Sequence, residues 1–205
     1  MSNRDKYGNP YDWFVEECFC TSLLLGAETF EGVTLDPACG QGNIVNTLIG
    51  AGLVAYGTDI VQRTNQDWFV GTLDFLSDDE PEVDFRNIIC NPPFYGSVGA
   101  EAFIRRALSL ASGKVAMFVE QRFLTSSGRS NGIYAEFPPD AIYAISPRPS
   151  CPPGQHLLDG GKLGGGKQDF VWLVWDMASE FGETRFQWLR GPSRKHRKKT
   201  NTASI

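Results

Sequence analysis

The first 120 residues alternate between short apolar runs and segments whose apolar residues recur at helical spacing, and this restricts the fold more than any other feature. Such alternation favours a mostly parallel sheet with helices on both faces. The sequence therefore predicts an α/β fold. Helices are expected at residues 11–25, 43–51 and 98–111, and strands at residues 33–36, 53–59, 68–71, 88–90 and 114–119. Glu16 and Glu17 are expected on the outer face of the first helix.

Three later strand-like runs, at residues 141–145, 170–175 and 184–189, have no helical pattern between them. We therefore expect an antiparallel edge pair. Residues 1–190 are expected to form a single domain. Within that domain, residues 147–168 are rich in Gly and Pro and are predicted to be a flexible loop able to contact substrate. Residues 191–205 are predicted to be a basic, disordered tail.

The distribution of charge narrows the possible partners. All 24 carboxylates and 13 of the 19 Lys and Arg residues precede Arg190, and the other six basic residues lie within 190–199. An acidic body does not suit a general nucleic-acid coat, so any nucleic acid must be held by a local patch. The basic end can contact phosphates, or it can be a solvated terminus.

The sequence suggests an intracellular protein. No run approaches the roughly 18 apolar residues that a membrane span needs, and the first residues lack the apolar core of a signal peptide. Five cysteines occur without a C-x-x-C pair, and the chain has two histidines. We therefore expect reduced thiols, no structural metal and no membrane partner.

One loop has unusual chemistry. The apolar run 88–90 ends in Asn91, Pro92, Pro93 and Phe94. Neither proline can donate to a sheet ladder, and a residue before proline avoids helical geometry. The loop presents an amide, backbone carbonyls and an aromatic ring at the carboxyl end of a strand, where ligands bind in open α/β sheets. Taken alone, it could also be a structural turn.

A second loop, from Asp36 to Asn43, joins the first strand to a helix. Gly40 and Gly42 allow a tight turn with the backbone close to a ligand, beside a helix N-terminus. Val45 stands where a dinucleotide fingerprint would have its third glycine, which disfavours NAD or FAD. Asp59 ends the next strand and can accept hydrogen bonds from ribose hydroxyls, although an ordinary turn aspartate remains an alternative.

The two loops together resemble the class I methyltransferases that use S-adenosylmethionine, and specifically small, phage-type adenine-specific DNA methyltransferases. Asp36-Pro37-x-x-Gly40-x-Gly42 is similar to the cofactor motif, and Asn91-Pro92-Pro93-Phe94 is similar to the catalytic motif, Asn/Asp-Pro-Pro-aromatic. The resemblance covers roughly residues 11–119 and continues weakly to 169–172. It implies a Rossmann-like, seven-stranded sheet whose last strand is antiparallel, in a cytoplasmic protein of a bacterial or phage-infected cell.

The resemblance also implies roles for individual residues. Asn91, Pro92, Pro93 and Phe94 would be catalytic. The cofactor S-adenosylmethionine would be bound by Asp36, Pro37, Ala38, Gly40, Gly42, Asp59, Ile60, Asp74, Phe75 and Trp13. Among these, Asp74 would accept from the adenine amino group of the cofactor with Phe75 against its ring, and Trp13 would close over it. Asp74 is also compatible with a plain turn.

The chemistry of the catalytic loop fits an amino group conjugated to a planar system, whose lone pair is delocalised. Two acceptors, the Asn91 amide oxygen and the Pro92 carbonyl, can bind its hydrogens and favour a tetrahedral nitrogen. The predicted reaction is methylation of the adenine amino group in DNA. Adenine in RNA and glutamine in a protein are alternatives, and a non-catalytic nucleic-acid-binding relative is a fourth.

A separate reader of DNA sequence is not evident. Residues 125–139, residues 147–168 and the basic tail are the segments left over for target recognition. Phosphate contacts are expected from Arg122, Arg129, Arg148, Lys162 and Lys167.

Overall fold

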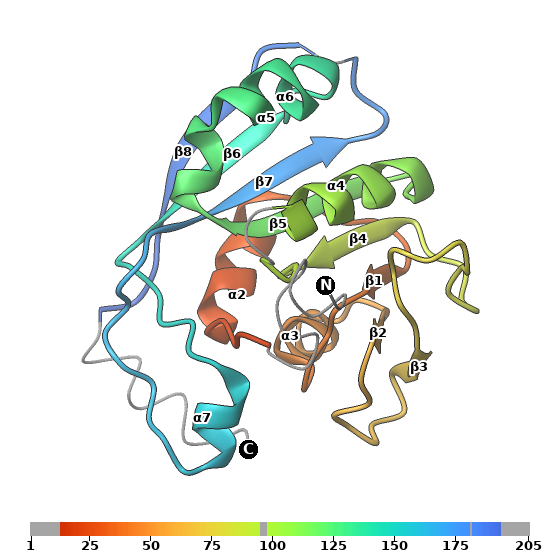
Figure 1. Cartoon of the computed structure of the whole chain (residues 1–205), viewed down its shortest axis with the longest axis vertical. Coiled ribbons are helices and arrows are strands. Elements are labelled where there is room, and N and C mark those ends of the chain that lie inside the picture. The colour runs from red at the N-terminus through yellow and green to blue at the C-terminus, as the bar shows by residue number, and fades with distance from the viewer. Residues whose placement is uncertain (1–12, 95–97, 181, 194–205) are drawn as a thin grey trace, which may run out of the picture.

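The computed structural model describes residues 13–94, 98–180 and 182–193 (Figure 1). These residues form an eight-stranded sheet in the order β3-β2-β1-β4-β5-β7-β6-β8. The strands are β1 (Thr34–Asp36), β2 (Ala55–Asp59), β3 (Phe69–Thr72), β4 (Asn87–Cys90), β5 (Lys114–Glu120), β6 (Ala141–Ser146), β7 (Phe170–Asp176) and β8 (Arg185–Arg190). The helices are α2 (Cys18–Ala27), α3 (Asn43–Gly50), α4 (Val98–Leu110), the 3-10 helix η2 (Gln121–Thr125), α5 (Ser127–Asn131), α6 (Ile133–Glu136) and α7 (Gly154–Leu158).

The pairing of the strands confirms a mixed, Rossmann-like α/β sheet but corrects two details. The sheet has eight strands rather than seven. The antiparallel pairs are β5–β7 and β6–β7, inside the sheet, whereas the edge pair β6–β8 is parallel. Every residue of β7 from Phe170 to Trp175 is buried, so this strand needs neighbours on both sides. Strand β8 is exposed at five of its six positions, which suits an edge.

Alternate residues of the central strands build two separate cores, one on each face of the sheet. On β5, Ala116 and Phe118 pack with α2 and α3, whereas Val115, Met117 and Val119 pack with α4 and α6. Helices α2 and α3 therefore lie on one side of the sheet, and α4, α5 and α6 on the other (Figure 1). This period-two alternation is what fixes the strands in register.

The predicted first helix starts too early. Helix α2 begins at Cys18, and Phe14 instead forms a β-bridge with Pro153 in extended backbone. Glu16 and Glu17 were expected outside but are 5% and 7% exposed. They are buried because each accepts a hydrogen bond, Glu17 from the backbone N–H of Ser150 at 2.7 Å and Glu16 from Asn91 at 2.8 Å. Tyr11 and Asp12 lie outside the described residues.

The segment 147–168 contains the short helix α7 and packs against the stretch before α2. The backbone N–H of Val15 donates to the Pro152 carbonyl at 2.9 Å, and that of Gly154 to the Trp13 carbonyl at 2.8 Å. Residues Pro152 and Gly154 are thus fixed by hydrogen bonds to the stretch before α2. The flexibility of the segment as a whole stays a prediction. Most of the predicted tail, 194–205, lies outside the described residues. No helix within the described ranges is long and apolar enough to cross a membrane.

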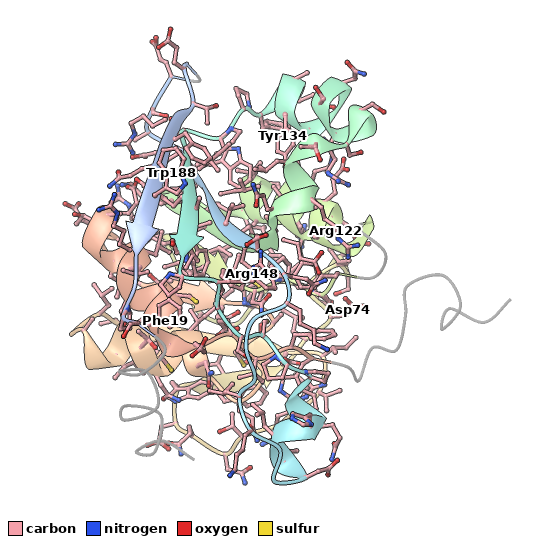
Figure 2. All side chains as sticks on the ribbon, turned by 90° about the vertical axis from the view of Figure 1, so that its left-hand side faces the viewer. Phe19, Asp74, Arg122, Tyr134, Arg148 and Trp188 are labelled. Atoms are coloured by element: carbon pink, nitrogen blue, oxygen red, sulfur yellow. The ribbon has the colours of Figure 1, made fainter. Side chains whose placement is uncertain are left out.

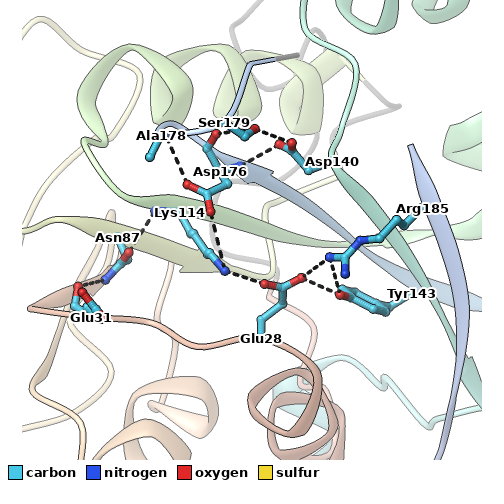
Figure 3. A network of polar contacts seen from close by, with 10 residues as sticks. All are labelled: Glu28, Glu31, Asn87, Lys114, Asp140, Tyr143, Asp176, Ala178, Ser179 and Arg185. Atoms are coloured by element: carbon cyan, nitrogen blue, oxygen red, sulfur yellow. Dashed lines mark hydrogen bonds and ion pairs between the residues drawn. The ribbon is translucent and has the colours of Figure 1, made fainter. Parts of the chain in front are cut away.

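A polar network joins several elements where the parallel strands begin (Figure 3). Glu28, after α2, forms ion pairs with Lys114 of β5 at 2.5 Å and with Arg185 of β8 at 2.9 Å. It also accepts a short hydrogen bond from the Tyr143 hydroxyl. Burial raises the pKa of Glu28, but these donors outweigh it and hold the pKa below the usual 4.5. The charges of Glu28, Lys114 and Arg185 are thus matched by partners of opposite sign.

Candidate active site

Three parallel strands bring the predicted residues together at the opposite, carboxyl end of the sheet. Strand β1 pairs with β2 on one side and with β4 on the other. Asp36 ends β1, Asp59 ends β2, and Asn91 follows β4. Residues from three distant stretches of the sequence therefore meet at the carboxyl end of the central strands, where ligands bind in open α/β sheets.

The loop from Asp36 to Gly42 depends on its two glycines. Gly40 and Gly42 have φ values of 55° and 91°, a region that other residues rarely adopt. A Cβ on Gly42 would lie 2.2 Å from the Trp68 ring, and a Cβ on Gly40 would lie 3.1 Å from the Trp13 ring. Pro37 is buried at the start of this loop. The backbone is thus held tightly against aromatic rings.

Asp59 ties this loop to β2. Its Oδ2 accepts from the Gly40 N–H at 2.8 Å, and its Oδ1 accepts from the Val61 N–H at 3.0 Å. The same Oδ1 forms an ion pair with Arg63 at 2.6 Å. The neighbouring Ile60 is 44% exposed. In this conformation both carboxylate oxygens of Asp59 have partners within the chain.

Trp13 lies against the glycine loop, and it belongs to extended chain and not to the predicted helix. Its ring packs against Gly40 and against Gly154 of α7. The Arg63 guanidinium lies 4.3 Å from the ring centroid. The indole Nε1 is buried and has no hydrogen-bond partner within the described part of the chain. A ligand acceptor would satisfy it.

Buried carboxylates accumulate around the loop. Glu16, Asp36 and Asp59 are at most 5% exposed. Burial, followed by repulsion from Glu16, raises the pKa of Asp36 well above its usual value, and burial also raises the pKa of Glu16. Among the described residues, Arg63 is the one basic side chain that forms an ion pair with any of the three. The site is thus short of positive charge and suits a cationic ligand.

The Asn91 amide is held in one orientation. Its Nδ2 donates to the Phe14 carbonyl at 3.0 Å and to Glu16 Oε2 at 2.8 Å, with Cys151 Sγ at 3.9 Å. A carbonyl and a carboxylate can only accept, so the amide nitrogen must face them. Asn91 Oδ1 is then buried without a hydrogen-bond partner among the residues described. An acceptor is left ready for a ligand N–H.

Aromatic rings surround the rest of the catalytic loop. Pro92 is buried and Pro93 half-buried. The half-buried Phe94 ring lies with its centroid 6.4 Å from that of Phe14 and 6.5 Å from that of Phe170. A planar group beside Asn91 would therefore meet apolar ring surfaces.

The residues after β3 are less clearly part of the site. Asp74 is exposed, and its Oδ1 accepts from the Leu76 N–H at 3.0 Å, as in an ordinary Asx turn. Phe75 is 2% exposed, with its ring 5.1 Å from that of Phe103 in the core under α4. The chain around Asp74 does join β2, because the Leu73 N–H donates to the Asp59 carbonyl at 2.9 Å.

The expected phosphate-binding residues have different surroundings. Arg122 is 78% exposed and paired with Glu120. Arg129 donates a hydrogen bond to the Phe123 carbonyl and makes a cation–π contact with the Phe123 ring. Arg148 forms a bidentate ion pair with Asp169. Figure 2 labels Arg122 and Arg148, which extend from the segments after β5 and β6. Lys162 and Lys167 are exposed.

Glu16 is the site residue that the sequence did not reveal. Read as part of a helix, it faces solvent, and the contact with Asn91 spans 75 positions. A carboxylate three positions after Trp13 was a weak signal. No sequence pattern predicted that Cys151 would contact Asn91 or that Gly154 would contact Trp13.

No protein-family model and no curated protein matches the sequence. Solved structures match the fold. A protein assigned as the modification subunit of a type I restriction enzyme from Vibrio vulnificus YJ016 aligns with TM-score 0.55 and 14% identity over 93% of this chain, which spans 50% of that protein's length. A protein assigned as an RNA methyltransferase from Pyrococcus horikoshii aligns with TM-score 0.54 and 12% identity over 78% of this chain and 81% of that one. The fold is that of the class I methyltransferases.

A third match qualifies what this fold implies. A protein assigned as a hemolysin from Lactococcus lactis aligns with TM-score 0.54 and 12% identity over 88% of this chain and 94% of that one. Since these identities are low, the likeness concerns the methyltransferase fold, and the function has to be argued from the site residues.

Proposed function

We propose that this chain transfers a methyl group from S-adenosylmethionine to the amino group of adenine in DNA. The observation that carries the proposal is the Asn91 amide, whose oxygen is buried, oriented and unpaired within the described residues. It follows a parallel strand next to the one that ends in Asp36. Such an acceptor fits a substrate N–H.

The buried carboxylates fit S-adenosylmethionine, which carries a sulfonium and an ammonium group. Asp36 and the backbone at Gly40 and Gly42 would hold its methionine part, near the negative charge of Glu16. Asp59 would hold the ribose once Arg63 has moved away from its Oδ1. Trp13 would lie against the bound molecule. When bound, the cofactor supplies an activated methyl group, which needs little further activation.

The chain's own residues would then activate the amine. Asn91 Oδ1 and the Pro92 carbonyl would accept its two hydrogens, which favours the tetrahedral nitrogen of the transition state. Phe94 would stack on the base, which must leave a duplex to reach the loop. Correct placement of the nitrogen in line with the methyl group supplies most of the remaining acceleration.

DNA is preferred as substrate because both motifs resemble those of adenine-specific DNA methyltransferases. One similar structure is assigned as a modification subunit of a restriction enzyme, while another is assigned as an RNA methyltransferase. Adenine in RNA is therefore the second candidate. Glutamine in a protein is disfavoured, since enzymes of that kind usually have Tyr where this chain has Phe94.

A substrate panel tests the proposal. The protein is incubated with S-adenosylmethionine labelled in its methyl group and with duplex DNA, single-stranded DNA, RNA or a protein extract. Nucleosides and amino acids are then separated and identified by mass spectrometry. We expect label on the amino group of deoxyadenosine, incorporated roughly 100-fold more slowly with Asn91→Ala. The exposed Asn65, whose amide oxygen accepts a hydrogen bond from Gln62, gives a matched control, because Asn65→Ala should retain activity. Label in RNA or protein but not in DNA would refute the DNA assignment.

A further inference from the structure

The hydrogen bond from Asn91 Nδ2 to Glu16 Oε2 matters because it fixes the orientation of the Asn91 amide. A carboxamide has nearly the same shape when its oxygen and nitrogen are exchanged, but only the oxygen can accept a substrate N–H. Nothing in Asn91 itself selects the useful orientation. The selection must come from the groups that surround its inner face.

Two acceptors make that selection. The Phe14 carbonyl and Glu16 Oε2 lie 3.0 and 2.8 Å from Asn91 Nδ2. If the amide were reversed, its oxygen would face two acceptors in a buried place, at the cost of two hydrogen bonds. Glu16 is 5% exposed, so water cannot easily substitute for it. Its main chain is also fixed, because Asn43 Nδ2 donates to the Glu16 carbonyl at 2.7 Å.

We propose that Glu16 is a positioning residue, whose carboxylate holds the Asn91 amide with its oxygen toward the substrate amine. This inference rests on the proposed methyl transfer and adds a residue to it. Glu16 itself touches neither the amine nor the methyl group. Its effect should therefore be on turnover through Asn91, and it should depend on Glu16 remaining an acceptor.

Protonation of Glu16 should weaken this control, because a carboxylic acid can donate to a reversed amide. Burial raises the pKa of Glu16, so turnover should decline as the pH falls through that raised value. Asp36 also has a raised pKa, whereas the neighbouring thiols stay neutral because burial raises their pKa values. The titratable groups that interact electrostatically with Glu16 are Asp36 of β1, Cys90 of β4, Cys151 of the segment 147–168, and Cys18 at the start of α2.

Kinetics provide the first test. In Glu16→Gln the new amide can serve as donor or acceptor, so both orientations of Asn91 become possible. At saturating cofactor we expect kcat to fall about 10- to 100-fold, the range for residues that orient catalytic ligands. The acid limb of the pH profile should disappear or move to lower pH. Glu17→Gln, which removes a similarly buried carboxylate bonded to Ser150, should keep the limb. Unchanged kcat and pH profile in Glu16→Gln would overturn the inference.

A reciprocal exchange gives a sharper test. Asn91→Asp places a second carboxylate against Glu16, and repulsion should leave this variant almost inactive. Adding Glu16→Gln supplies a donor to the introduced carboxylate, so the double variant should be at least 10-fold more active than Asn91→Asp alone. A purely structural role for Glu16 predicts that the two defects add. Additive losses would therefore contradict positioning.

A measurement on the protein without substrate separates the two proposals. In nuclear magnetic resonance spectra, the chemical shifts of the Asn91 side-chain NH2 should change with pH as Glu16 becomes protonated. The same signals should shift or broaden in Glu16→Gln. Signals that respond to neither change would overturn the positioning role, whatever the enzyme methylates. If the signals respond but no substrate in the panel is labelled, the proposed function fails and the Glu16–Asn91 contact stands.

Discussion

The two ends of the sheet treat buried charge in opposite ways. Where the parallel strands begin, Glu28 is surrounded by Lys114, Arg185 and Tyr143, and its pKa is lowered (Figure 3). Where the strands end, Asp36 lies among other carboxylates, and its pKa is raised. The first arrangement stabilises the fold. The carboxylates around Asp36 destabilise the fold by repelling one another, and a positively charged ligand would relieve this repulsion.

This difference makes the carboxyl end of the sheet the candidate binding site. Buried groups that repel one another persist when a ligand or a reaction needs them. At the carboxyl end the described chain contains a carboxylate cluster, an unpaired Asn91 oxygen and an unpaired Trp13 nitrogen. At the amino end the polar groups of the network bond to one another. Variants at the two ends should therefore differ in whether they change activity or stability.

The largest effect is expected for Asn91→Ala at the carboxyl end. Loss of one acceptor should cost about 3 kcal/mol of transition-state stabilisation, or roughly 100-fold or more in kcat. Cofactor affinity, measured by calorimetry, should stay within about threefold because the proposed partner of the amide oxygen is the substrate amine. A variant with normal turnover would make the catalytic loop a structural turn.

Asp36→Asn should separate binding from stability at the same end. The neutral side chain removes a buried charge, so the thermal unfolding midpoint without cofactor should rise by a few degrees at neutral pH. Cofactor affinity should drop roughly 10-fold or more because the cation loses its partner. A carboxyl whose pKa is raised on folding loses stability as the pH rises through that value. The advantage of the variant should therefore grow from acidic to neutral pH, and an advantage that shrinks would contradict this account.

Glu28→Gln should give the reverse result at the amino end. We expect a loss of about 2 kcal/mol in the free energy of unfolding at neutral pH, since Arg185 loses its charged partner and Lys114 is left with the longer ion pair to Asp176, at 3.7 Å. Urea denaturation measures it, and kcat should not change. The lowered pKa means that Glu28 stabilises the fold above its usual value of 4.5 and loses this effect as the pH falls through its folded value. The gap between wild type and variant should close below that range. A fall in kcat without loss of stability would remove the distinction between the ends.

The smallest effect is expected for Arg63→Met, which releases Asp59 Oδ1. Arg63 forms an ion pair with Asp59 at 2.6 Å and lies against Trp13. Its removal frees an acceptor and leaves the cluster more negative, so cofactor should bind a few-fold more tightly. Titration of the cofactor by calorimetry measures this. Weaker binding would mean that Arg63 contacts the bound molecule rather than competing with it.

The fold was largely predictable because it follows from local patterns. Strand runs such as 114–119 and the helix from Asn43 were recognised from periodicity and from glycines at their ends. The positions of Asp36, Asp59 and Asn91 at one end of the sheet followed, since parallel strands end together. The prediction of an antiparallel edge pair was wrong, because local patterns do not show which of the late strands will lie between two others. Strand β7 takes the inner place because both of its faces are apolar.

The sequence by itself determined a mostly parallel α/β sheet and, within it, an Asn-Pro-Pro-Phe loop and a glycine loop. Each of these is encoded within a few consecutive residues, through side-chain period, proline geometry and glycine φ values. Only the tertiary structure decided that Glu16 turns inward, that Trp13 covers Gly40 and that the oxygen of Asn91 is the atom left unpaired. These features depend on contacts between residues far apart in the chain, and local preference cannot specify which acceptor will be buried beside which donor.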